Sequence, residues 1–246
     1  GALLSGIDKF GARFSRIAYL NQGWSAADSL WFYNTNQGSN LLPFSFFLML
    51  EQADSVNLFR DDRNIDRYGY LPQRATTRNP NGLPVGMVKD EYQGKAYMGF
   101  TCAACHTTQI NYDHIGIRID GGPANADMEN FMIDLAKALF VTLETEEKRN
   151  RFIANVLQQK EYDNADEVIA DLEKYALRIR AYTIINFPRD AKRPLTHYGY
   201  GRLDAFGRIY NRVLEHIMSA KQMRELLTDV LSPDELSDVM MNVEPI

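Results

Sequence analysis

Residues 102–106 read Cys-Ala-Ala-Cys-His, and they contain the only two cysteines of the 246-residue chain. Two cysteines three positions apart lie on the same side of a helical turn, and the next residue brings an imidazole beside them. The pattern C-x-x-C-H is the attachment signature for c-type haem, in which each thiol forms a thioether and the histidine binds the iron. The sequence therefore predicts one covalent haem c on Cys102 and Cys105, with His106 as the proximal iron ligand.

Three other roles for this pair of cysteines have less support in the sequence. A thioredoxin-like redox motif needs a strand–helix–strand context, which the flanking residues do not indicate. A structural zinc site needs two further ligands at metal spacing, and the chain has no second cysteine cluster. A disulfide across two intervening residues is strained and adds little stability. The haem interpretation uses both cysteines and leaves no thiol over.

The sixth iron ligand is open at the level of sequence. His114 follows His106 so closely in the sequence that it is poorly placed to reach the opposite face of a haem. His216 lies on the apolar stripe of an expected helix. His197 lies in the loop Pro194-Leu-Thr-His-Tyr-Gly-Tyr200, which leaves it room to reach the iron, and is therefore a candidate. The other options are an axial methionine and no protein ligand at all. An open position would allow O₂ or peroxide to bind.

Two glycine-containing segments carry further candidate residues. Arg118 opens Arg-Ile-Asp-Gly-Gly-Pro-Ala124, and Arg202 lies within Tyr198-Gly-Tyr-Gly-Arg-Leu-Asp-Ala-Phe-Gly207. Glycines permit tight turns close to a bulky group, and a guanidinium pairs well with a carboxylate. We therefore expect Arg118 and Arg202 to bind haem propionates, with a solvated arginine as the alternative in each case.

Helical periodicity dominates the chain, so we expect a mainly α fold. Residues 3–52 carry apolar residues at spacings of three and four, and Ser25 with Asp28 forms a short capping box. Residues 60–99 are rich in turn formers, and no run alternates convincingly enough to indicate a strand. After Ala126 four apolar stripes indicate helices, within Met128–Leu139, Phe152–Leu157, Val168–Ile179 and Phe206–Ile217.

The expected organisation is one haem domain over residues 1–246, cytochrome c-like, with long irregular loops and added helices. Residues 1–95 would form a helical and loop-rich extension that wraps the haem core, and residues 96–246 would form the helical core itself. Within the extension, the apolar run Leu41–Leu50 is expected to be a core helix after a turn.

The composition narrows the class of protein. The chain is 45% hydrophobic and 24% charged, which excludes long-range disorder. Its net charge of −5 makes nucleic acid a poor partner, and no run approaches the roughly 20 apolar residues that span a membrane. The N-terminus lacks a basic stretch before an apolar block, so we expect a signal peptide to be absent or already removed.

Trp24 and Trp31 are expected to pack in the core, with electron transfer as the alternative.

Four segments of the sequence together resemble one family. The segments are Leu83-Pro-Val-Gly-Met-Val-Lys89, Gly99-Phe-Thr-Cys-Ala-Ala-Cys-His-Thr107, Arg118–Ala124 and Gly201-Arg-Leu-Asp-Ala-Phe-Gly207, supported by Gln22-Gly-Trp24 and Trp31–Gly38. They resemble secreted dihaem c-type cytochromes of the cytochrome c peroxidase superfamily, in the rubber-oxygenase-like and fatty-acid-dioxygenase-like branch. The resemblance covers roughly residues 20 to 215.

The resemblance implies two haem domains, a periplasmic or secreted bacterial location, and redox chemistry at iron. This chain holds one C-x-x-C-H motif, so it corresponds to the N-terminal haem half, with the second haem in another chain or a C-terminal domain. We expect an exported haem redox module of a dihaem oxygenase- or peroxidase-like oxidoreductase that acts with O₂ or peroxide and a redox partner protein. The alternatives are a monohaem electron-transfer cytochrome without turnover and a haem-bearing partner or sensor subunit.

Overall fold

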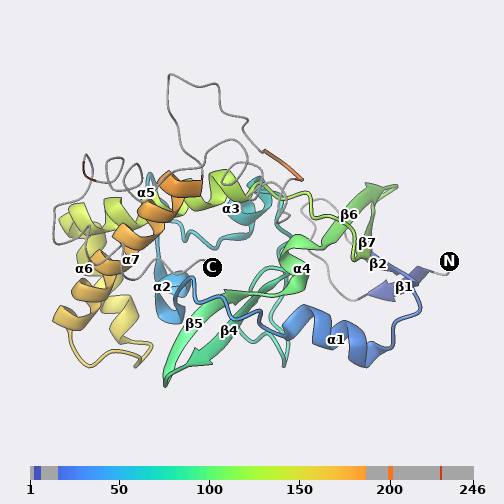
Figure 1. Cartoon of the computed structure of the whole chain (residues 1–246), viewed down its shortest axis with the longest axis horizontal. Helices are drawn as coiled ribbons and strands as arrows, with labels where there is room; N and C mark the ends of the chain where they lie inside the picture. Colours follow the sequence, from blue (N-terminus) through green and yellow to red (C-terminus); the bar gives the residue numbers. More distant parts are fainter. Residues whose placement is uncertain (1–2, 7–15, 187–198, 202–227, 229–246) are drawn as a thin grey trace. The chain divides into compact units, whose positions relative to one another are not determined.

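A computed structural model describes residues 3–6, 16–186, 199–201 and 228 (Figure 1). This part of the chain contains seven helices and seven strands, and the strands form two sheets. The expectation of a mainly α, cytochrome c-like fold is therefore wrong, because the described residues are mixed α/β. The chain divides into two compact units: the first takes in 1–49, 57–128 and 200–203, and the second 50–56, 129–199 and 204–246.

A four-stranded sheet in the first unit has the order β1-β2-β7-β6. Its strands are β1 (Leu3–Gly6), β2 (Arg16–Leu20), β6 (Thr107–Tyr112) and β7 (Ile115–Asp120). The central strands β2 and β7 pair in parallel, and the outer pairs are antiparallel. Ile17 and Ala18, expected on a helix, lie in β2 and are buried. The helical pattern expected from residue 3 onward is thus wrong in these two strands.

A three-stranded antiparallel sheet in the same unit has the order β3-β5-β4. Its strands are β3 (Leu42–Pro43), β4 (Met87–Tyr92) and β5 (Lys95–Phe100). The helix α2 (Phe44–Met49) follows β3 directly and packs against β5, with most of its side chains buried. The core helix expected within Leu41–Leu50 is therefore confirmed.

Both hairpins close through two-residue turns of left-handed backbone. Gln93 and Gly94 join β4 to β5 with φ angles of 51° and 76°, and Asp113 and His114 join β6 to β7 with φ angles of 44° and 59°. Two consecutive positive φ angles define the turn whose twist matches that of the flanking strands. The turn at Gln93 and Gly94 lies within residues 60–99, where the sequence predicts loop, and it joins two paired strands there.

The remaining helices of the first unit are α1 (Ala26–Asn34), α3 (Asp62–Arg67) and α4 (Cys102–Cys105). The predicted capping box is confirmed: the Ser25 hydroxyl accepts from the amide of Asp28, and the Asp28 carboxylate accepts from the amide of Ser25. The core packing expected for two tryptophans is wrong, because Trp24 is 41% and Trp31 is 62% exposed.

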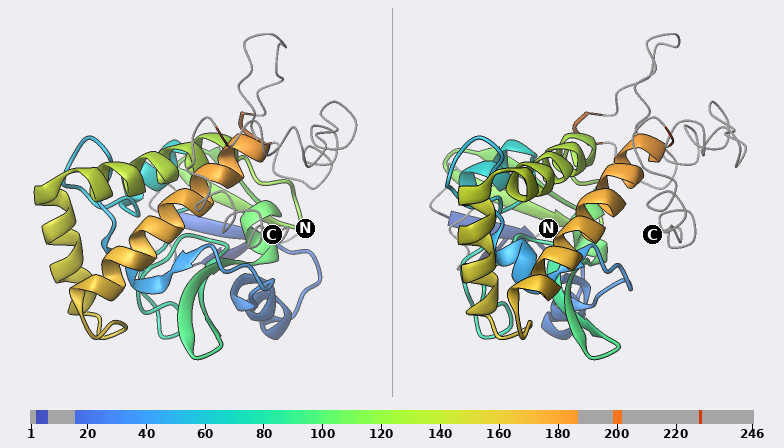
Figure 2. Two further views of the ribbon diagram at one scale, coloured as in Figure 1. Left: turned by 60° about the vertical axis from the view of Figure 1, so that its left-hand side comes forward. Right: turned by 90° about the vertical axis from the view of Figure 1, so that its left-hand side faces the viewer.

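The second unit contains three helices among its described residues. It contains α5 (Met128–Glu144) except for its first residue, α6 (Glu146–Leu157) and α7 (Ala165–Asn186). Helix α6 packs against α7, which Figure 2 shows as the long orange helix. Three of the four predicted apolar stripes are confirmed, since their central residues Leu135, Val156 and Leu172 are fully buried. The fourth stripe, Phe206–Ile217, lies outside the described residues.

A charged cluster holds the segment 50–56 onto α6 within this unit. The Glu51 carboxylate, 7% exposed, accepts hydrogen bonds of 2.8 Å from Arg151 through both of its oxygens. Lys148 donates to Glu51 at 3.1 Å and to the carbonyl oxygen of Gln52 at 2.8 Å. Both oxygens of the buried carboxylate are thus paired with cationic side chains.

Among the described residues, none of the helices has the length and apolar character that a membrane span requires.

Candidate functional site

The Cys-x-x-Cys-His motif lies on α4, a single helical turn that connects β5 of one sheet to β6 of the other. The side-chain oxygen of Thr101 caps the turn by accepting from the amide of Ala103 at 3.2 Å. At the other end the amide of His106 donates to the carbonyl oxygen of Cys102 at 2.9 Å. The cap and the closing bond fix the backbone of the motif without any ligand.

The two thiols of the turn are partly accessible. Cys102 and Cys105 are half-buried, whereas Ala103 and Ala104 between them are buried. Residues three apart lie on one side of a helix, so the alanines face the protein interior and the cysteines share the opposite side. No disulfide joins the two cysteines.

A glycine of the preceding segment lies directly against the turn. Gly86 has a φ of +84°, and a side-chain carbon placed on it would lie 2.1 Å from the backbone nitrogen of Ala104. The carbonyl oxygen of Gly86 accepts from the amide of Thr101 at 2.9 Å. Only glycine permits both this backbone conformation and this approach. The run Leu83–Lys89 thus contacts the motif through Gly86.

The segment after β7 supports the motif from its other end. The amide of Gly121 donates to the carbonyl oxygen of His106 at 2.7 Å, and the amide of Ala124 donates to that of Cys105 at 2.8 Å. The glycine-containing segment 118–124, selected from sequence, is therefore bonded to the motif through its backbone. The His106 side chain is exposed and follows the two thiols directly.

The chemistry of this donor set fits the cofactor that the motif predicts. Two thiols on one turn that share no disulfide could each add to a vinyl group of a haem, and the imidazole of the next residue could bind its iron. Among the described residues, no group of three or more His, Cys, Asp and Glu side chains is arranged to hold a metal ion. The role of His106 as the iron ligand stays a prediction from the sequence.

Arg118 lies at the centre of a row of polar side chains across the four-stranded sheet. It is fully buried, and the register places it opposite Tyr19 on β2 and opposite Gln109 on β6. Its Nε donates to the side-chain oxygen of Gln109 at 3.1 Å, and its Nη1 lies 3.5 Å from the hydroxyl of Tyr19. The guanidinium therefore stabilises the sheet, and its predicted contact with a haem propionate stays a prediction.

A tyrosine of α1 is hydrogen-bonded to the last residue of β7. The Tyr33 hydroxyl donates to the carboxylate of Asp120, whose charge also interacts with Arg118. Burial, and then the hydrogen bond to Asp120, raise the pKa of Tyr33 above its usual range. Burial also raises the pKa of Asp120, against the opposing effects of Tyr33 and Arg118. Tyr33 therefore keeps its proton at neutral pH and donates a hydrogen bond to Asp120.

The other residues selected from sequence do not gather at the motif in the part described. His114 occupies the tip of the β6–β7 hairpin and is exposed. His197, the candidate sixth ligand, and Arg202, the second candidate for a propionate, lie outside the described residues, as does His216.

A pocket of about 640 Å³ opens in the first unit, beside the Arg118 row. Tyr19 and Tyr33 contribute to its lining, together with Phe44 and the cationic Arg78 and Lys89. This volume is typical of a site for a small molecule. Tyr33, which lines the pocket, packs against the same buried cluster as Cys102, formed by Phe32, Val85 and Ala103.

One wall of the pocket is fixed by an asparagine. The side-chain amide of Asn79 donates to the carbonyl oxygen of Leu83 at 2.7 Å, and its oxygen accepts from the amide of Leu83 at 2.9 Å. The same amide nitrogen lies 3.2 Å from the side-chain oxygen of Gln73. Asn79 therefore ties together three parts of the turn-rich stretch that the sequence placed over the cofactor.

Comparison with known proteins gives limited information about the chain. No family model matches it, and no solved structure matches it. It is similar to a protein of Sinorhizobium fredii (strain NBRC 101917 / NGR234) described as "Uncharacterized protein y4iJ", with 29% identity over 225 residues. The match covers 82% of this chain and 36% of that relative, so the chain spans about a third of the length of the relative it matches.

Sequence reasoning missed the polar partners of Arg118. Asp120 lies two residues beyond Arg118 on β7, so the two side chains share one face of the strand. The alternation Ile-Arg-Ile-Asp over residues 117–120 is the signal that indicates this arrangement. Tyr33 has no comparable signal, because it reaches Asp120 from a helix that begins far earlier in the chain.

Proposed function

We propose that this chain is an exported c-type haem redox protein, with one haem c bound covalently to Cys102 and Cys105 and with His106 as the proximal iron ligand. The observation that carries the proposal is the turn α4, on which two half-buried thiols lie three positions apart and an exposed imidazole follows. The turn is capped and hydrogen-bonded at both ends by the protein itself, so its geometry does not depend on the cofactor.

The chain's own residues would anchor and orient the cofactor. Thr101 and Gly86 hold the N-terminal end of the turn, and the backbone amides of Gly121 and Ala124 hold its C-terminal end. When bound, the haem supplies one-electron chemistry at iron and a coordination position that can take O₂ or peroxide. The turn would hold Cys102 and Cys105 as the anchors of the haem and His106, the next residue, as the ligand of its iron.

The wider assignment is to an N-terminal haem module of a dihaem oxygenase- or peroxidase-like oxidoreductase. Its support is the set of four sequence segments that resemble that family. On this proposal the second haem belongs to a C-terminal domain or to a partner chain, and a separate redox protein supplies electrons. Because haem c is attached after export, the location is the periplasm or the exterior.

Haem attachment is tested by producing the chain in a bacterial periplasm that contains a c-type maturation system. Intact mass should increase by one haem, and the haem should survive acid–acetone extraction. Cys102→Ala with Cys105→Ala should abolish the increase, whereas the matched variant His114→Ala, in an exposed turn, should retain it. A wild-type chain that leaves this system without haem would overturn the proposal.

The reaction class is tested on the haem-loaded chain by optical spectroscopy. Oxygen or peroxide chemistry predicts that CO binds the ferrous form and that peroxide changes the ferric spectrum. A six-coordinate iron that responds to neither ligand, with a reversible one-electron couple, would assign the chain to the electron-transfer cytochromes instead.

A further inference from the structure

A series of aromatic rings leads from the surface into the first unit. The ring centroids of Trp24 and Phe32 are 5.0 Å apart, those of Phe32 and Tyr33 are 5.4 Å apart, and those of Tyr33 and Tyr19 are 6.5 Å apart. Each pair meets edge to face, which is a favourable arrangement for aromatic rings. Trp24 is 41% exposed, whereas Phe32 is buried. The series therefore connects a solvent-accessible indole to a half-buried phenol.

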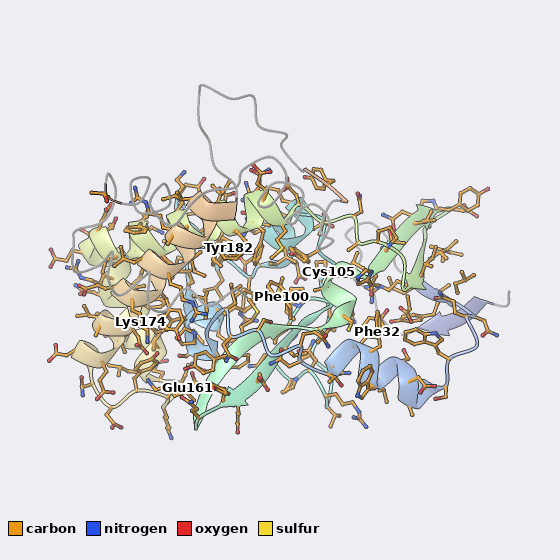
Figure 3. The ribbon with its side chains drawn as sticks, viewed as in Figure 1. Phe32, Phe100, Cys105, Glu161, Lys174 and Tyr182 are labelled. Atoms are coloured by element: carbon orange, nitrogen blue, oxygen red, sulfur yellow. The ribbon has the colours of Figure 1, made fainter. Side chains whose placement is uncertain are left out.

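The inner part of this series lies beside the haem-attachment turn. Phe32, Val85 and Ala103 form a buried cluster, and both Tyr33 and Cys102 pack against it. Helix α1 packs against α4, and Figure 3 shows Phe32 on α1 and Cys105 on α4. Because electron tunnelling weakens steeply with distance, the packing places Tyr33 where it can exchange an electron with a group attached to Cys102.

Tyr33 has a partner for the proton that tyrosine loses on oxidation. A phenol becomes strongly acidic when it loses an electron, so it is oxidised readily only where a base within hydrogen-bond reach accepts its proton. The carboxylate of Asp120 accepts the hydrogen bond from Tyr33 directly. A second pair of this kind, Tyr162 and Asp171 with 2.8 Å between their oxygens, lies in the second unit and provides an internal comparison.

We infer that Tyr33 is a redox-active tyrosine that relays single electrons between the haem on α4 and Trp24 at the surface, with Asp120 as the acceptor of its proton. The relay as a whole rests on the proposed haem attachment. One electron passes from Tyr33 to haem iron that peroxide has oxidised, and the phenolic proton moves to Asp120. An external one-electron donor then reduces the tyrosyl radical through Trp24, and the proton returns from Asp120 to Tyr33.

The relay can be tested on the full chain before any haem is attached. Trp31→Phe leaves Trp24 as the one tryptophan, because the chain contains two. Flash photolysis of ruthenium tris-bipyridine with persulfate then generates a Trp24 radical. We expect this radical to decay as a neutral tyrosyl radical forms, and transient absorption and electron paramagnetic resonance distinguish the two species. Proton transfer in the same step predicts slower decay in D₂O.

The variants assign this step to Tyr33 and Asp120. Tyr33→Phe should abolish formation of the tyrosyl radical from Trp24, and Asp120→Asn should slow it on the order of a hundredfold, the usual effect of losing a positioned proton acceptor. Tyr162→Phe should leave the rate unchanged. A rate that is the same in Tyr33→Phe as in the parent, or that Asp120→Asn does not alter, would overturn the inference.

A second arm separates the relay from the proposed function. In the haem-loaded chain, peroxide should produce the Tyr33 radical, and Tyr33→Phe should lose it while intact mass confirms the haem. A chain that binds no haem but shows the photochemical transfer retains the Trp24–Tyr33 step and refutes the haem assignment. A chain that carries haem but gives no Tyr33 radical in either arm refutes the relay alone.

Discussion

Gly86 lies so close to Ala104 that a side-chain carbon on the glycine would come within 2.1 Å of the alanine's backbone nitrogen. Gly86→Ala should therefore displace the turn α4, the proposed site of haem attachment, and also place alanine at a φ of +84°. We expect the free energy of unfolding to fall by about 2–4 kcal/mol and the fraction of chains that acquire haem to fall with it. Chemical denaturation and intact mass measure the two effects.

Gly94→Ala is the matched control for this substitution. Gly94 has a similar φ of +76°, but no atom lies within 4 Å of the position that a side-chain carbon would take. It should therefore lose only about 1 kcal/mol, from the backbone conformation alone. Equal losses in Gly86→Ala and Gly94→Ala would show that contact with the turn is unimportant.

The acid stability of the second unit should depend on Glu51. The hydrogen bonds from Arg151, with a smaller contribution from Lys148, hold the pKa of Glu51 below its ordinary value of 4.5 despite burial. The unfolded chain therefore takes up this proton more readily, and the stability that Glu51 contributes is present above pH 4.5 and is lost as pH falls through the folded-state pKa. Urea unfolding between pH 7 and pH 3 should show this loss.

Glu51→Gln should remove this part of the pH dependence and lower the free energy of unfolding at pH 7 by about 1–2 kcal/mol. Glu91→Gln is the surface comparison, since Glu91 pairs with Lys89 at 3.5 Å and both side chains are largely exposed. The loss there should stay below about 0.5 kcal/mol. A pH slope unchanged in Glu51→Gln would contradict the assigned role of the buried carboxylate.

Asn79 should control the shape of the pocket. Asn79→Ala removes both hydrogen bonds to the backbone of Leu83 and should lower the free energy of unfolding by about 1–2 kcal/mol. Amide hydrogen exchange over residues 76–83 should become faster. In the neighbouring Asn81 only the backbone carbonyl is used, by Arg60, so Asn81→Ala should leave exchange in this stretch unchanged. Equal exchange in the two variants would count against the clamp.

Arg118 should be intolerant of substitution by lysine. Its guanidinium reaches both Gln109 and Tyr19 from one buried position, and an ammonium group does not reproduce that planar fork. Arg118→Lys should cost about 2–3 kcal/mol of unfolding free energy, while Tyr19→Phe should cost about 1 kcal/mol or less because it removes only the longer contact. A fully stable Arg118→Lys chain would refute this assignment.

The helices of the second unit could be predicted from the sequence, and the sheets of the first unit could not. Leu135, Val156 and Leu172 belong to stripes of helical period, and each stripe has one buried face. Strands β4 and β6 carry a fully buried residue only at their first position, Met87 and Thr107 respectively. Alternation is weak where the strand is otherwise partly or fully exposed, so the sequence predicts a turn-rich stretch over the first hairpin and part of a helical core over the second.

The Cys-x-x-Cys-His motif does not determine the fold around it. A four-residue turn with two thiols needs only a cap and a short closing bond, which Thr101 and His106 provide between two strands. Such a turn is compatible with many architectures, so the mainly α expectation did not follow from it. The Tyr33–Asp120 hydrogen bond was likewise out of reach, because it joins residues 87 positions apart.

The parallel pairing of β2 with β7 sets an order on the formation of the first unit. Tyr19 can pair only when its register partner Arg118, 99 residues later in the chain, has been brought beside it. Contacts this distant in sequence form late, because the entropy of closing the intervening chain opposes them. Cys102 and Cys105 both precede β7, so a chain that emerges from its N-terminus presents both thiols before the sheet can close. The haem attachment proposed for α4 would therefore have an interval in which it competes with no finished tertiary structure.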